Sequence, residues 1–155
     1  MPPKTILLMS LKKLNILLAD DDIDDCRFFK QALEALPIST ELVTVHDGDE
    51  LISYLEANTT HLPHVLFLDI NMPRKNGFEC LSEIKKNEKL KDIPVVMFST
   101  SKAPDKINIL FNSGADVYIH KPSSFSELVQ VIHHALPVAA ENIFSNGKLK
   151  YILNA

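Results

Sequence analysis

The segment "LNILLADDDIDDCRFFKQALEAL" (residues 14–36) decides the fold, because it joins a buried strand to an amphipathic helix. Residues 14–19 are apolar except for Asn15, as expected for a strand that is covered on both faces of a sheet. After the aspartates, apolar side chains recur at helical spacing: Phe28, Phe29, Ala32, Leu33 and Leu36. Pro37 then ends the helical pattern. A strand followed directly by a helix is the first half of a βαβ unit.

The same alternation continues along the chain. Further apolar runs predict strands at 41–45, 64–69, 93–99 and 116–121. Amphipathic stretches predict helices at 47–57, 76–87, 104–115 and 123–136. Gly114 suits the position after a helix end, and Ser124 with Glu127 suits a helix start. Five strands alternating with five helices predict a parallel sheet with helices on both faces.

The length of 155 residues is that of one ordinary domain. We expect this domain over residues 12–136, with an N-terminal extension at 1–11 and a C-terminal tail at 137–155. The Asn146-Gly147 pair between apolar residues hints at a hairpin in the tail. A disordered tail, or one that docks on a partner, is an equal alternative.

Composition excludes several classes of function. The formal net charge is −4, so no broad basic surface for direct binding of nucleic acid is expected. No apolar run approaches the ~18 residues that a membrane span needs, and no signal peptide is recognisable. The two cysteines, Cys26 and Cys80, have no metal-binding spacing and indicate reduced thiols in a cytoplasmic protein.

Polar side chains of matching chemistry follow the predicted strands. Asp20 and Asp21 end the first strand, Asp69 the third, Ser99 the fourth and Lys121 the fifth. In an open parallel sheet the carboxyl ends of the strands form the ligand-binding edge, so these groups should meet there. Converging carboxylates repel unless a cation intervenes, and Mg²⁺ prefers such oxygen ligands.

The remaining acids of the cluster have a simpler explanation. Asp22, Asp24 and Asp25 lie in the expected first turn of a helix, where negative charge is favourable, and we assign them to structure. A calcium loop beginning at Asp20 does not fit, because such a loop needs glycine at its sixth position and glutamate at its twelfth. Here those positions hold Asp25 and Gln31.

Four motifs together resemble the receiver domain of two-component response regulators. They are "LLADDD" (17–22), "LFLDINMPRKNGFE" (66–79), "PVVMFSTS" (94–101) and "YIHKP" (118–122). The resemblance covers residues 12–136, and each motif lies at the end of an expected strand. It implies a flavodoxin-like, doubly wound (βα)5 three-layer sandwich with strand order 2-1-3-4-5. It also implies a stand-alone signalling protein that is no enzyme beyond its own phosphoryl acceptance and loss.

The resemblance implies a metal-assisted phosphorylation site. Asp69 corresponds to the phosphoacceptor. Asp20 and Asp21 correspond to the acidic pair that holds Mg²⁺ together with Asp69, and Asp21 is the more direct ligand. Asn71 corresponds to the position whose backbone carbonyl coordinates the metal.

The resemblance also implies a switch. Ser99 corresponds to the hydroxyl that follows the phosphoryl group, and Tyr118 to the aromatic side chain that moves inward after it. Lys121 corresponds to the lysine that pairs with a phosphoryl oxygen, with a cis peptide bond to Pro122. The changed surface would comprise the fourth helix, the fifth strand and the fifth helix.

Partners follow from the same resemblance. The donor would be a histidine kinase or a histidine phosphotransfer protein that docks near the first helix, where we expect Cys26 and Phe29 to be partly exposed. The output would be contact with a downstream protein of unknown identity, and a homodimer through the switch surface is left open.

Two other functions fit the sequence less well. An aspartyl phosphatase of the dehalogenase type needs a second aspartate two residues after the nucleophile, but that position is Asn71. A degenerate receiver-like interaction module would never take phosphate. The presence of Asp69, Ser99 and Lys121 opposes it.

Overall fold

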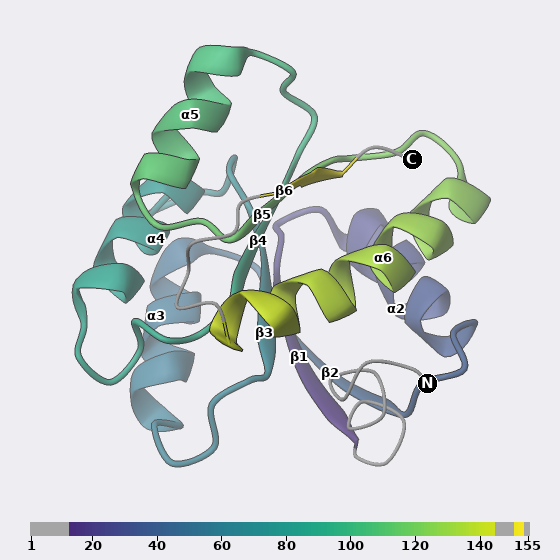
Figure 1. Ribbon diagram of the computed structural model, residues 1–155. Coiled ribbons are helices and arrows are strands. Elements are labelled where there is room, and N and C mark those ends of the chain that lie inside the picture. Colours follow the sequence, from purple (N-terminus) through teal and green to yellow (C-terminus); the bar gives the residue numbers. More distant parts are fainter. Residues whose placement is uncertain (1–12, 145–150, 154–155) are drawn as a thin grey trace.

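A computed structural model describes residues 13–144 and 151–153. Its strands are β1 (Leu14–Ala19), β2 (Thr40–Val45), β3 (Val65–Asp69), β4 (Val95–Ser99), β5 (Val117–His120) and β6 (Tyr151–Leu153). Its helices are α2 (Ile23–Glu34), α3 (Gly48–Ala57), α4 (Gly77–Lys86), α5 (Pro104–Asn112) and α6 (Phe125–Phe144). All strand pairs are parallel, and the sheet order is β2-β1-β3-β4-β5-β6 (Figure 1). The predicted fold class and the order of the first five strands are confirmed.

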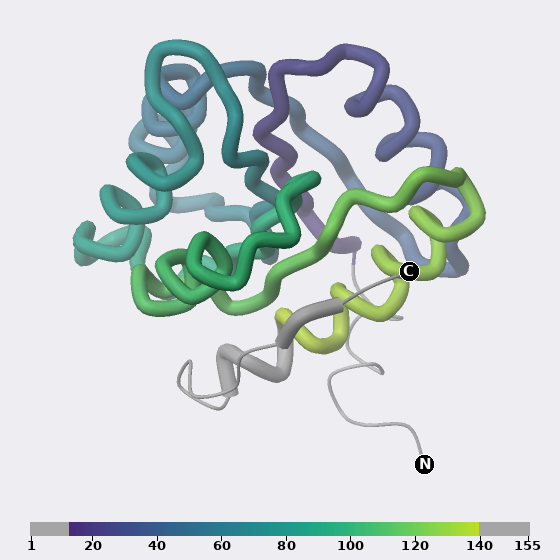
Figure 2. The backbone as a smooth tube through the Cα atoms, turned by 90° about the horizontal axis from the view of Figure 1, so that it is seen from above, coloured from purple at the N-terminus to yellow at the C-terminus, as the bar shows by residue number. Residues whose placement is uncertain are grey.

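Helices cover the sheet on both sides (Figures 1 and 2). The buried side chains of α2 and α6 pack on one face, around Phe29, Phe67 and Ile132. Those of α3, α4 and α5 pack on the other, around Leu51, Leu81 and Leu110. Because β3 and β4 lie inside the sheet with every residue buried, their near-continuous apolar sequences are explained.

Short polar motifs set the helix boundaries. The Asp22 side chain caps α2 by accepting a hydrogen bond from the backbone N–H of Asp25. Asn76 and Glu79 form a capping box at the start of α4. The expected cap at Ser124 is confirmed, since its hydroxyl accepts from the N–H of Glu127 at 3.2 Å. These caps fix where each helix begins after its strand.

The C-terminal part differs from the expected layout. Helix α6 continues through Pro137 to Phe144, past the end expected at residue 136. Proline removes one hydrogen bond, but Ala135, Leu136 and Ala139 prolong the buried stripe of the helix. Tyr151–Leu153 then forms a strand parallel to β5, whereas a hairpin would have needed an antiparallel pair. The Asn146-Gly147 pair lies outside the described residues.

The exposed residues of α2 are not the expected ones. Cys26 and Phe29 are buried, because they point toward the sheet. The expectation that they are partly exposed is therefore wrong. Ile23 and Phe28 are the large apolar side chains of α2 that reach solvent.

Over the described ranges, none of the helices has the length and apolarity needed to cross a membrane.

Gly77 allows α4 to start against the backbone that carries Asp69. Its N–H donates to the carbonyl of Ile70 at 2.8 Å. A Cβ atom at this position would lie 2.3 Å from the Asp69 carbonyl oxygen and 2.7 Å from the Ile70 Cα. Both contacts are with backbone atoms, which cannot rotate away, so close packing explains this glycine.

We predict that Gly77→Ala lowers the free energy of unfolding by roughly 1–3 kcal/mol, the usual cost of overpacking. Alanine is intrinsically better in a helix by up to ~1 kcal/mol, but the clash outweighs that gain. Urea denaturation measures the difference. The matched control is Lys86→Ala on the exposed end of the same helix, which should change little. Equal stability of the Gly77 variant and the wild type would contradict the argument.

Candidate phosphorylation site

Three carboxylates converge at the carboxyl edge of the sheet. Asp20 directly follows β1, Asp21 is next in the chain, and Asp69 is the last residue of β3. Each offers an oxygen within 4.8 Å of the others, and we call these three residues the acidic triad. Asp20 and Asp69 are buried, whereas Asp21 is exposed. The convergence predicted from the strand ends is therefore present.

Lys121 brings a positive charge to the acidic triad from the end of β5. Its ammonium nitrogen lies 3.0 Å from Asp20 Oδ2 and 3.6 Å from Asp69 Oδ1. The lysine side chain is only 14% exposed, so the pairs are poorly screened by water. The same nitrogen lies 5.4 Å from the centre of the Phe98 ring, within the range of a cation–π contact.

Asp20 is fixed by several neighbours. Its Oδ1 accepts a hydrogen bond from the backbone N–H of Asp22 at 3.0 Å. Its carbonyl oxygen lies 3.1 Å from His46 Nδ1 and 3.4 Å from the Cys26 thiol, which donates to it. Its own N–H donates to the Val45 carbonyl. This carboxylate is thus held in place at the edge of the sheet.

The site favours proton binding by its two buried carboxylates, Asp20 and Asp69, and retains the charge of its lysine. Burial raises the pKa of Asp69 to about 6, against the opposing effect of Lys121. Burial also raises the pKa of Asp20. Burial alone would lower the pKa of Lys121, but the carboxylates of Asp20 and Asp69 outweigh it and raise that pKa. Additional positive charge near the triad would therefore stabilise both ionised carboxylates.

The hydroxyl groups of the predicted switch lie together at the end of β4. Ser99 is buried, and its Oγ accepts a hydrogen bond from the N–H of Ser101 at 3.2 Å. The Tyr118 ring is buried as well, and its hydroxyl donates to the Ser101 carbonyl. The segment after β4 is therefore hydrogen-bonded to both predicted switch residues. The Tyr118 side chain points into the protein interior in this structure.

Two expectations for the loops have different outcomes. The peptide bond between Lys121 and Pro122 is trans, so the implied cis bond is wrong for this structure. Trans is the lower-energy isomer of such bonds in the absence of a packing constraint. Asn71 lies exposed two residues beyond Asp69, and the role of its backbone carbonyl stays a prediction.

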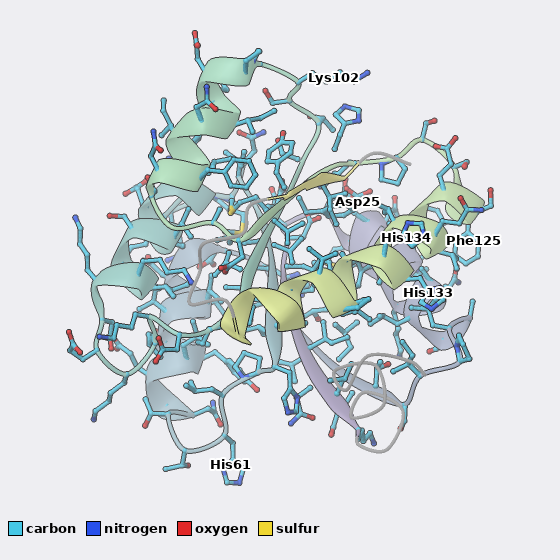
Figure 3. The ribbon with its side chains drawn as sticks, viewed as in Figure 1. Asp25, His61, Lys102, Phe125, His133 and His134 are labelled. Carbon is cyan, nitrogen blue, oxygen red and sulfur yellow. The ribbon has the colours of Figure 1, made fainter. Side chains whose placement is uncertain are left out.

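Sequence reasoning missed the contact between Asp25 and Lys121. Asp25 lies in the first turn of α2 as expected, but its Oδ2 also accepts from Lys121 Nζ at 3.1 Å. Figure 3 shows Asp25 near the loop that leads into α6, and His61 at the opposite end of the molecule. The sequence does contain a signal for this contact: only three residues separate β1 from α2, so the first turn of α2 lies beside the end of β1.

The family model for the response regulator receiver domain matches residues 16–133. The chain belongs to this family. It is therefore a receiver domain of the two-component response regulators, and the acidic triad is compatible with divalent-metal binding and aspartyl phosphorylation. Receiver domains are signalling modules.

Single-domain response regulators are among the relatives of this receiver. Response regulator Rcp1 of Synechocystis sp. is 32% identical over 135 residues, which cover 84% of this chain and 85% of Rcp1. The structure of the phosphorylated cyanobacterial phytochrome response regulator RcpA matches with a TM-score of 0.72 and 35% identity, covering 87% of this chain and 96% of RcpA. The Mn²⁺-bound form of Rcp1 matches with a TM-score of 0.70 and 30% identity, covering 78% of this chain and 90% of Rcp1.

The raised pKa of Asp69 predicts a specific pH dependence of stability without metal. The folded receiver holds the Asp69 proton up to about pH 6, whereas the unfolded chain loses it near the ordinary value of 3.8. In that window the folded state binds more protons, so the contribution of Asp69 to stability falls as pH rises. Asp69→Asn should therefore be more stable than the wild type by roughly 1–3 kcal/mol at about pH 7.5. The gain should shrink toward about pH 4.

Urea denaturation at the two pH values, in the presence of a chelator, measures this difference. Asp105→Asn at the exposed start of α5 controls for the loss of a surface charge. An advantage of the Asp69 variant that is the same at both pH values would contradict the effect of burial on Asp69.

Proposed function

We propose that this receiver accepts a phosphoryl group on Asp69 from a histidine kinase or a histidine phosphotransfer protein, in a Mg²⁺-dependent reaction. The observation that carries the proposal is the meeting of the acidic triad with Lys121 at one edge of the sheet. Oxygen ligands and one fixed cation around a single carboxylate are the groups that phosphoryl transfer requires.

The chemistry of the transfer uses the carboxylate as a nucleophile. An oxygen of Asp69 attacks the phosphorus atom of a phosphohistidine. The new P–O bond forms as the P–N bond breaks, and the imidazole leaves with the electron pair. Lys121 then offsets the charge that develops on the phosphoryl oxygens.

The acidic triad fits a hard divalent cation, because its three carboxylates supply oxygen atoms within 4.8 Å of one another. We assign Asp20, Asp21, Asp69 and the backbone carbonyl of Asn71 as ligands. When bound, Mg²⁺ supplies positive charge next to the phosphoryl oxygens. A lysine alone cannot neutralise three carboxylates and a phosphoryl group, which supports the need for the metal.

The proposed output is a change of the surface formed by α5, β5 and α6. The phosphoryl group adds nearly two negative charges and strong acceptors beside Ser99 and Lys121. Ser99 would turn to donate its hydroxyl proton to a phosphoryl oxygen. The backbone of Ser101 is hydrogen-bonded to both Ser99 and Tyr118. A shift of Ser99 would therefore also disturb the hydrogen bond between the Tyr118 hydroxyl and the Ser101 carbonyl. A protein partner would read this surface.

The remaining assignments belong to the same proposal. We assign residues 12–136 to the receiver unit and residues 1–11 and 137–155 to its flanks, and helix α6 runs across this boundary to Phe144. The protein acts in the cytoplasm, which fits the free thiols of Cys26 and Cys80. Its catalysis is limited to its own phosphoryl acceptance and loss.

A homodimer through the surface of α5, β5 and α6 is an additional arrangement to test. A degenerate module that never takes phosphate is the alternative.

Acyl-phosphate mapping tests the proposal. The chain has no tryptophan, so mass spectrometry replaces fluorescence. The protein is incubated with acetyl phosphate and Mg²⁺, and the acyl phosphate is reduced with borohydride before digestion. The expected result is a single modified peptide, altered at Asp69, and no modification with a chelator. Modification elsewhere, or no modification by either acetyl phosphate or a phosphorylated histidine phosphotransfer protein, would overturn the proposal.

A further inference from the structure

Asp25 has a contact that its place in a helix start does not explain. The ammonium of Lys121 has three N–H donors. The described contacts within hydrogen-bond distance use two of them, to Asp20 at 3.0 Å and to Asp25 at 3.1 Å. Asp69 lies farther away, at 3.6 Å. The lysine that must serve the phosphoryl group is thus drawn toward two other carboxylates.

The two carboxylates differ in what else they do. Asp20 belongs to the acidic triad and is buried, so its charge is already part of the metal site. Asp25 stands outside the triad on α2, and its side chain is 41% exposed. It therefore competes for Lys121 without supplying a ligand to the cation site.

Asp25 also lines an open groove together with Lys121. A groove of about 390 Å³ between α2 and the start of α6 is lined by Asp25, Lys121, Phe28 and Phe125, among others. Phe28 and Phe125 are about half exposed. A small anion that approaches Lys121 from this groove would meet the negative charge of Asp25, which repels it.

We propose that Asp25 is a positioning residue that holds Lys121 away from Asp69 and slows phosphoryl acceptance from small anionic donors. This inference rests on the proposed function of Asp69. Phosphoryl transfer needs the Lys121 charge at the developing phosphoryl oxygens, so the contact with Asp25 must weaken first. A donor protein with a cationic side chain opposite Asp25 would release Lys121, whereas a small anion cannot.

The test compares Asp25→Asn with a matched control, Asp24→Asn. Asp24 lies in the same helical turn, pairs with Arg27 at 3.8 Å and is 74% exposed. Both variants lose one negative charge from the helix start, but only Asp25→Asn removes an ion pair with Lys121. We expect Asp25→Asn to accept phosphoryl from acetyl phosphate two- to five-fold faster than Asp24→Asn, the range for one partly exposed ion pair. Asp25→Glu, which restores a carboxylate, should return the rate toward that of the wild type.

A second measurement needs neither metal nor phosphate. The rate at which an amine-reactive reagent modifies Lys121, followed by mass spectrometry, should rise about two- to five-fold in Asp25→Asn relative to Asp24→Asn. Changes in helix stability alone would affect both variants and would not single out Lys121.

The outcomes separate the two proposals. If the wild type accepts phosphoryl on Asp69 but the Asp25 and Asp24 variants have equal rates, the role of Asp25 is overturned and the proposed function stands. A slower Asp25→Asn would also overturn it, because the contact would then assist Lys121. If the wild type takes no phosphoryl group from acetyl phosphate or from a phosphorylated histidine phosphotransfer protein, the proposed function fails. In that case the amine-modification assay still tests the contact. Equal rates of Lys121 modification in Asp25→Asn and Asp24→Asn would show that Asp25 does not hold Lys121.

Discussion

Asp69→Asn is expected to abolish the Mg²⁺-dependent uptake of a phosphoryl group. Asparagine keeps the shape of the side chain but removes the charged oxygen that attacks phosphorus, and an amide oxygen is a much weaker nucleophile. Because Asp69 is buried and its pKa is raised to about 6, loss of its charge should not unfold the receiver. Phosphoprotein is quantified by intact-mass spectrometry after incubation with acetyl phosphate.

Asp24→Asn is the control for Asp69→Asn, because it makes the same chemical change on the exposed side of α2. It should reach the same extent of phosphorylation as the wild type. Uptake by Asp69→Asn at the normal rate would show that Asp69 is not the acceptor. Borohydride mapping would then show whether Asp20 takes the group instead.

The main groups of this site could be predicted from the sequence, because topology rather than side-chain detail brings them together. Asp20 and Lys121 are 101 residues apart, yet their charged atoms lie 3.0 Å from each other. Each follows a largely apolar strand, and parallel strands end at one common edge. Recognising the strands in the sequence was therefore enough to predict that Asp69 lies beside Asp20 and Lys121.

Other features depended on information that local patterns do not contain. The contact of Asp25 with Lys121 depends on how the first turn of α2 is rotated over the sheet edge. The burial of Cys26 depends on the same rotation. The continuation of α6 past Pro137 depends on the packing of Ala139, which outweighs a local preference to stop the helix. Pairing of β6 with β5 joins segments more than 30 residues apart.

Lys121→Met is expected to lower the rate of phosphoryl acceptance by about 10²–10³-fold, the usual effect of removing one preorganised group that stabilises transition-state charge. Methionine retains an unbranched apolar side chain beside Phe98. The substitution also leaves Asp20 and Asp69 without the cation that opposes the rise of their pKa. Protonation of Asp69 would then compete with its attack, so the loss should be larger at about pH 6 than at about pH 8.

Lys85→Met separates this chemical role from the general cost of losing a poorly exposed ion pair. Lys85 is 17% exposed and pairs with the buried Asp116 at 3.4 Å, at the amino end of the sheet. Both lysine variants should lose stability, because each leaves a buried carboxylate without its lysine partner. Only Lys121→Met should lose phosphoryl acceptance when both are measured at a temperature where they are folded. An equal loss in the two variants would mean that Lys121 supports the fold and not the transfer, because Lys85 lies at the opposite end of the strands from Asp69.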